Sequence, residues 1–314
     1  YPADTVLDFF TYAGAPGAYN LAGLGAGAGF VYSPKWAKGL TISQNYVSGE
    51  GSAYAGTTSM GNASSGNPEN GGIMTNGAGS AAVTQIGYVS DKTPFIGGSY
   101  GIAFAYTYSQ NLTLPVGTPL ALQYSDYNAG ANGYTSGNNY GLSGYWKPSK
   151  SGLIPSISWG FGGGSYNVGS ATVPNTNPPG APGNGSSITP TQGITIASWY
   201  TGLQWDDAFI KGNALGMGVG QAPFVTQRGS MAAGTPGSTT ASTNGGGQTG
   251  SYDSNYMWEW WYKFQVTDNI SVTPAIYYIS NFNGQLGTQN LNAGSSGPAA
   301  SNVFGGLLKT TFKF

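Results

Sequence analysis

Apolar and polar side chains alternate with a period of two along much of the chain, most clearly over residues 253–266. In that segment the odd positions include Asp253, Asn255, Glu259 and Lys263. Successive side chains of a β-strand point to opposite faces of its sheet, so the segment predicts a strand with one polar and one apolar face. The even positions, which form the apolar face, include Tyr256, Trp258, Trp260, Tyr262 and Phe264.

The same separation of faces recurs in further segments. At the end of the sequence Phe312 and Phe314 fall on one face, while Lys309 and Lys313 fall on the other. Applied along the whole chain, the period of two predicts about twelve antiparallel strands. They are expected at residues 5–13, 19–33, 39–48, 81–90, 94–108, 137–147, 153–167, 192–205, 210–222, 252–266, 269–281 and 301–314.

The connections between the predicted strands alternate between short and long. The long ones, for example 49–80 and 223–251, are rich in Gly, Ser, Thr, Asn and Pro. The strands are also longer than the roughly 5 or 6 residues typical of soluble proteins, and they match the roughly 9 to 11 that cross a bilayer at a tilt. Outer-membrane barrels combine these features. We therefore expect an all-β fold, a transmembrane antiparallel up-and-down β-barrel forming a single domain over residues 1–314.

The composition excludes several classes of function. Lys and Arg number 10 and Asp and Glu 11, so only 7% of the 314 residues are charged and the net charge is −1. A chain with so few cations offers no basic surface to a nucleic acid. The absence of His and Cys removes the commonest general base, the thiolate nucleophile and the usual zinc ligands. No enzymatic activity, metal or cofactor is expected.

The polar face offers candidates for the lining of a pore. Glu259 and Lys263 lie about 13 Å apart by strand rise, so they would bias ion passage through their field rather than as a contacting pair. Solvation of an inner wall explains them equally well. Asp126 and Arg228 lie in long loops that could fold inward and narrow the barrel, although exposed loop residues are the default reading. The expected pore-lining residues are Asp253, Asn255, Glu259, Lys263, Lys309 and Lys313.

The apolar face offers candidates for contact with lipid. Its expected membrane-facing residues are Tyr256, Trp258, Trp260, Tyr262, Phe264, Phe312 and Phe314. The tryptophans Trp36, Trp146 and Trp205 lie in or beside short turns, where an aromatic belt at a membrane interface is expected. A packed soluble core is the competing explanation. A core would need two opposing apolar faces, and these strands offer one each.

Three segments resemble a known family. The sequences GLTISQNYV (39–47), WEWWYKFQVTDNISVTPAIYY (258–278) and GGLLKTTFKF (305–314) are similar to cyanobacterial outer-membrane porins of the carbohydrate-selective porin (OprB-like) superfamily. Phe312 and Phe314 also resemble the terminal signal that outer-membrane barrels present to their assembly machinery. The resemblance implies a cyanobacterial outer-membrane barrel of about sixteen strands in a homotrimer, with an upstream peptidoglycan-binding SLH domain. Compared with that family, this sequence is expected to lack this domain and about four N-terminal strands.

The expected function is a passive diffusion channel for inorganic ions and small hydrophilic solutes, in contact with outer-membrane lipid. Three alternatives stay open at this point. They are a sugar-selective channel, a structural outer-membrane anchor with a narrow or plugged pore, and a secreted adhesive or fibrous protein rich in Gly and Tyr.

Overall fold

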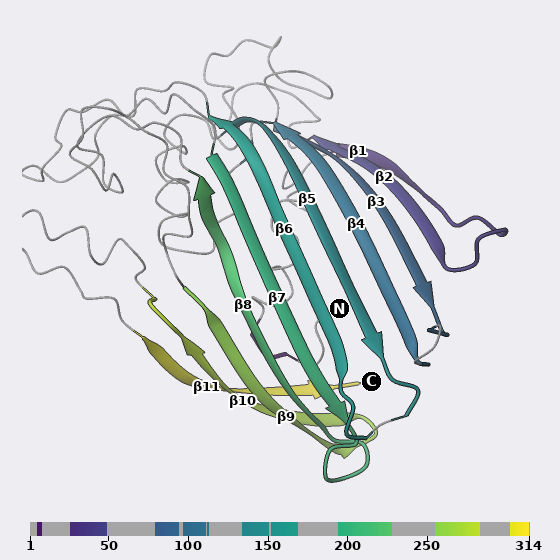
Figure 1. The fold of residues 1–314 in the computed structure, drawn as a ribbon, viewed down its shortest axis with the longest axis vertical. Helices are drawn as coiled ribbons and strands as arrows, with labels where there is room; N and C mark the ends of the chain where they lie inside the picture. Colours follow the sequence, from purple (N-terminus) through teal and green to yellow (C-terminus); the bar gives the residue numbers. More distant parts are fainter. Residues whose placement is uncertain are drawn as a thin grey trace, which may run out of the picture.

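The chain forms one antiparallel sheet in which eleven strands follow one another in space in the order of the sequence (Figure 1). The computed structural model describes residues 5–7, 26–48, 79–93, 97–110, 112, 134–150, 152–168, 194–227, 255–282 and 302–313. These residues contain no helix long and apolar enough to cross a membrane. The expected all-β, up-and-down topology is confirmed.

The strands are up to 14 residues long. Their bounds are β1 (Ala26–Tyr32), β2 (Leu40–Ser48), β3 (Ser80–Ser90), β4 (Ser99–Gln110), β5 (Tyr134–Lys147), β6 (Ser156–Val168), β7 (Ile194–Asp206), β8 (Ala214–Gln227), β9 (Met257–Thr267), β10 (Ile270–Ile279) and β11 (Val303–Phe312).

Short and long connections alternate between these strands, as predicted. Only Asp268 and Asn269 separate β9 from β10, whereas residues 228–256 separate β8 from β9. Because neighbouring strands are antiparallel, all the short connections join strands at one end of the sheet and all the long ones at the other. We call these the short-turn end and the long-connection end.

Several predicted strands differ in the structure, and those expected from residues 94 and 252 begin at Ser99 and Met257. The described part of the strand expected over 5–13, Thr5–Leu7, is not a strand and contacts β9 and β11 near one edge of the sheet instead. The strand expected from residue 210 begins at Ala214. The preceding turn is longer than expected because Asp207 (φ 57°) and Phe209 (φ 62°) take a left-handed conformation, which ends the extended backbone early. Eleven strands are therefore described, against the expected number of about twelve.

The two edges of the sheet are β1 and β11. Within the described ranges β1 pairs only with β2, and β11 pairs only with β10. The structure therefore shows a continuous curved wall, and closure of that wall into a barrel is taken up below as a proposal.

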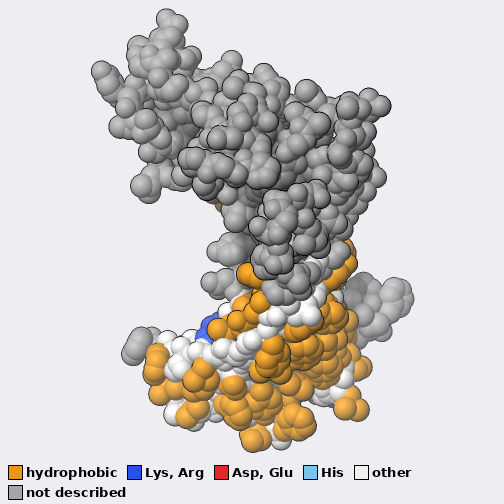
Figure 2. All heavy atoms as spheres, turned by 90° about the vertical axis from the view of Figure 1, so that its left-hand side faces the viewer, with side chains coloured by type: hydrophobic (Ala, Val, Ile, Leu, Met, Phe, Trp, Pro, Cys, Tyr) orange, Lys and Arg blue, Asp and Glu red, His pale blue; other side chains and the backbone are white. Residues whose placement is uncertain are grey.

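The two faces of the sheet differ sharply in chemistry. We call outer the face that carries Phe104, Phe161 and Trp260, whose side chains are 45%, 56% and 38% exposed. We call inner the face that carries Asn139 and Glu259, which are both 0% exposed. In the view of Figure 2, hydrophobic side chains cover most of the described surface, and no Asp or Glu is visible. The segregation of faces expected from the period of two is confirmed.

The buried core lies against the inner face. Strand register places Thr107 of β4, Asn139 of β5, Gly164 of β6 and Ile196 of β7 side by side on this face. The Asn139 amide donates to the Thr107 carbonyl (3.3 Å) and accepts from the hydroxyl of Tyr166. Buried polar groups need such partners, so this part of the inner face is a packed and satisfied polar layer.

Glycines on the inner face make room for aromatic rings from the next strand. Trp261 of β9 lies over Gly216 of β8, and Tyr277 of β10 lies over Gly305 of β11. A Cβ atom added at either glycine would overlap the ring. A glycine has no side chain to cover its own backbone, and an aromatic ring from the neighbouring strand covers it instead. Part of the high glycine content therefore reflects packing between strands.

Candidate functional site

The candidate site is the inner face of β8–β11. Register aligns Glu259 of β9 with Gly218 of β8 and with Tyr277 of β10. Lys263 of β9 is also on the inner face, four residues from Glu259 toward the short-turn end. Lys309 of β11 lies opposite Thr273 of β10 at that level. Acidic and basic groups therefore occupy different levels of one wall.

The Glu259 carboxylate binds the backbone of a distant segment. Its Oε1 accepts from the N–H of Val6 at 2.6 Å, and its Oε2 accepts from the N–H of Leu7 at 2.9 Å. Lys309 Nζ donates to the carbonyl oxygen of Thr5 at 3.3 Å. Thr5–Leu7 is thus held at three successive residues by two strands that lie more than 250 positions away in the sequence.

Between these anchors lies a buried indole. Trp261 is 2% exposed, and its ring rests over Gly216. Among the described residues no acceptor meets its Nε1–H, and no donor meets the Oδ1 atom of Asn255, which is 1% exposed. Unsatisfied buried polar atoms are rare in folded proteins, so this part of the inner face differs from the satisfied layer around Asn139.

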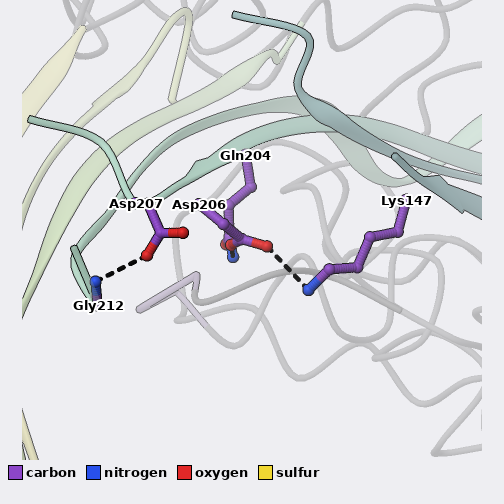
Figure 3. Close-up of polar contacts among 5 residues, drawn as sticks. All are labelled: Lys147, Gln204, Asp206, Asp207 and Gly212. Carbon is purple, nitrogen blue, oxygen red and sulfur yellow. Dashed lines mark hydrogen bonds and ion pairs between the residues drawn. The ribbon is translucent and has the colours of Figure 1, made fainter. Parts of the chain in front are cut away.

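An ion pair lies at the short-turn end of the inner face (Figure 3). Lys147 Nζ at the end of β5 is 2.8 Å from Oδ2 of Asp206 at the end of β7, so the pair bridges the intervening strand β6. Gln204 Nε2 donates to the Asp206 Oδ1 at 2.8 Å, and Asp207 Oδ1 accepts from the N–H of Gly212 at 2.8 Å. These contacts brace the rim where β5–β8 end.

Loss of this ion pair should cost little stability. We expect Lys147→Met to lower the free energy of unfolding by less than about 1 kcal/mol, because the Lys147 side chain is 55% exposed and water screens the pair. Denaturant titration of Lys147→Met, Asp206→Asn and the double variant measures the coupling. Lys150→Met, which removes a charge from the same turn, is the control. A coupling above about 2 kcal/mol that persists in 1 M salt would contradict this assignment.

The tryptophans in or beside the short turns differ in their contacts, and the aromatic belt expected of them at a membrane interface stays a prediction. The indole N–H of Trp146 donates to the Gly97 carbonyl and that of Trp205 donates to the Leu153 carbonyl, each at 2.9 Å. Trp36 is 80% exposed. Further along β9, Trp258 and Trp260 stack on the outer face with ring centroids 6.3 Å apart. Trp146 and Trp205 are thus each bonded to the short turn between two other strands.

The structure places most of the predicted site residues on the expected face. Of the pore-lining candidates, Asn255, Glu259, Lys263 and Lys309 are on the inner face, and Lys309 and Lys313 are exposed. The membrane-facing candidates Tyr256, Trp258, Trp260, Tyr262, Phe264 and Phe312 are on the outer face. Their roles in lining a pore and in meeting lipid stay predictions. The candidates Asp126, Arg228, Asp253 and Phe314 lie outside the described residues.

Sequence reasoning missed the partners of Glu259. Val6 and Leu7 were expected within a strand, and they act through backbone N–H groups, which carry no signature in the sequence. Trp261 was also missed, because it stands on the polar face of β9 and only its glycine neighbour reveals its role. Within the described ranges, no three His, Cys, Asp or Glu side chains converge so as to hold a metal ion.

Comparison with known proteins adds one relative. No protein-family model matches the chain. The chain is similar to an uncharacterized protein of Nostoc sp. (strain PCC 7120), with 28% identity over 204 residues. The match covers 63% of this chain but 24% of the Nostoc protein, so the chain spans about a quarter of that relative's length.

Proposed function

We propose that this chain forms the wall of a bacterial outer-membrane β-barrel and acts as a porin. In this role it is a passive diffusion channel for inorganic ions and small hydrophilic solutes. The observation that carries the proposal is the division of the sheet into two faces. Large apolar side chains such as Phe104 and Trp260 stand exposed on the outer face, while Glu259, Lys309 and the Lys147–Asp206 pair are on the inner face.

A lipid environment explains the outer face better than water does. Exposed apolar patches on soluble monomers rarely exceed a few hundred Å², yet exposed Phe, Tyr, Ile and Leu side chains recur on this face in β3–β6 and again in β9–β11. In hydrocarbon the backbone polar groups must all be paired, which a sheet achieves only when it closes. The strands β3–β11 have 10 to 14 residues, enough to cross the bilayer core at a tilt.

The proposal also requires the sheet to close into a barrel, which involves its two edge strands, β1 and β11. The two edge strands would pair with each other or with further strands, and the family resemblance implies about sixteen in the complete barrel. The resemblance also supplies the expected partners, which are outer-membrane lipid, two further copies of the chain in a homotrimer, and peptidoglycan through an upstream SLH domain. Nostoc, the source of the relative, is a cyanobacterium, in keeping with a cyanobacterial outer membrane.

Single-channel recording tests the proposed function. We expect the purified protein, added to a planar lipid bilayer in KCl, to insert in steps that carry an ohmic current. The control is the same protein after denaturation in urea. If insertion is verified by protection from protease but no current flows, the channel function is wrong.

A structural anchor with a narrow or plugged pore is the second candidate. It is favoured by the burial of the inner face, where Asn139, Thr107 and Glu259 have no exposed surface. A sugar-selective channel is the third, supported by the resemblance alone. Liposome swelling separates the three, because a general channel admits salts and sugars according to size, a selective one favours sugars, and an anchor admits neither.

A further inference from the structure

We propose that Thr5–Leu7 is an internal plug, a segment of the chain that docks on the inner wall through Glu259 and Lys309 and whose release opens the channel and exposes a cation-selecting carboxylate. The inference rests on the proposed porin function, because a plug requires a channel. It assigns to Glu259 the role of a latch and then of a selectivity group.

The contacts match the polarity of the segment group by group. A carboxylate can accept a hydrogen bond at each oxygen, and Glu259 receives the N–H groups of two consecutive residues, Val6 and Leu7. An ammonium group can only donate, and Lys309 donates to the carbonyl of Thr5. Charged partners make such bonds roughly twice as strong as neutral ones, so the wall holds bare backbone without needing particular side chains.

The side chains of Glu259 and Lys309 reach the segment from two different levels of the wall. Glu259 lies level with Gly305 of β11, while Lys309 lies two same-face positions further toward the short-turn end. That separation corresponds to about 13 Å of strand rise. Trp261 lies between the two levels with its indole N–H unpartnered among the described residues. The Thr5 carbonyl and the Val6 N–H belong to one peptide group, so the two side chains converge on the same short stretch of backbone.

The latch is suited to release. No strand pairing holds Thr5–Leu7, and its three residues are only partly buried. The buried charge of Glu259 needs hydrogen-bond donors, and when Val6 and Leu7 leave, water or a permeating cation must take their place. An ionised carboxylate freed on a narrow wall attracts cations and repels anions. Opening and cation preference are therefore linked through one side chain.

The first test measures docking without measuring transport. The sequence contains no Cys, so Thr5→Cys introduces a single thiol and leaves the backbone contacts of the segment in place. We expect reaction with a charged maleimide to be at least tenfold faster when Glu259→Gln or Val6→Pro is added, because each removes part of the latch. Asp268→Asn, which removes an exposed carboxylate from the turn after the same strand, is the matched control and should leave the rate unchanged.

The second test measures the channel. Val6→Pro deletes one N–H donor and keeps Glu259, so we expect at least twice the wild-type conductance with a reversal potential shifted toward cations in a KCl gradient. Glu259→Gln should also raise conductance, but without the cation shift. Equal heat-modifiable mobility on gels shows that each variant has kept its folded sheet.

The outcomes separate the plug from the porin. Labelling rates that ignore Glu259→Gln and Val6→Pro overturn the plug even if the wild-type protein conducts. Labelling that responds while no variant conducts shows that the segment docks, and it refutes the channel function. Conductance that rises equally in both variants with the same ion preference overturns the selective role of Glu259.

Discussion

Placing arginine at Phe104 will destabilise the protein in lipid by about 2–4 kcal/mol, the cost of a cationic side chain near the middle of the bilayer on a barrel surface. Phe104 lies midway along β4 on the outer face, opposite Ile86 and Leu142, and is 45% exposed. In a water-soluble sheet the same substitution at an exposed site would change stability by less than about 0.5 kcal/mol. The sign and size of the effect therefore report what the outer face contacts.

The matched control moves the same charge to the end of the sheet. Leu153 is 96% exposed in the turn between β5 and β6, where a membrane interface is expected. Leu153→Arg should cost only about 0–1 kcal/mol. Denaturant titration in lipid vesicles, followed by Trp fluorescence, measures both variants. Equal and negligible costs would contradict a lipid-facing outer surface and with it the proposed porin.

Adding a methyl group at Gly216 will destabilise the sheet by about 1–3 kcal/mol, because it overpacks the inner face. A Cβ at this position would overlap the indole ring of Trp261, which is buried and has little room to move. At Gly152 no atom lies within 4 Å of an added Cβ, so Gly152→Ala is the control and should be close to neutral.

A double-mutant cycle makes this prediction specific. Trp261→Ala alone should cost about 3–5 kcal/mol, because it leaves a cavity on the inner face. In that background Gly216→Ala should become neutral or stabilising, since the ring that it clashes with is gone. A cost for Gly216→Ala that is the same with and without the ring would show that the glycine is required for its backbone and not for Trp261.

The period-two pattern predicted the wall well, because alternation is a local property of a strand. It placed Trp260 and Phe264 on one face and Glu259 and Lys263 on the other, and the register of β9 with β10 confirms that division. It failed at Thr5–Leu7, the described part of the strand expected over 5–13, which has no strand structure. It also misplaced the start of β8, since left-handed backbone at Asp207 and Phe209 is set by the turn as a whole.

The candidate site was less accessible to sequence reasoning. Glu259 and Lys309 could be named as inner-face charges, but their partners are backbone atoms of Thr5, Val6 and Leu7, far away in the chain. Every residue except proline has a backbone N–H, so the residue type does not show which of these groups will bind a side chain. The Lys147–Asp206 pair is similar, because each residue reads as an ordinary turn charge until strand order brings β5 and β7 to either side of β6.

The sequence by itself determined the class of fold, the up-and-down order and the chemistry of each face, because these follow from side-chain alternation and from the lengths of the connections. Only the tertiary structure decided what those faces touch. Register between strands laid Trp261 over Gly216, and the path of the chain brought Val6 and Leu7 to the Glu259 carboxylate. Contacts of this kind depend on which distant segments lie close together in space, and the pattern of residue types along the chain does not specify that.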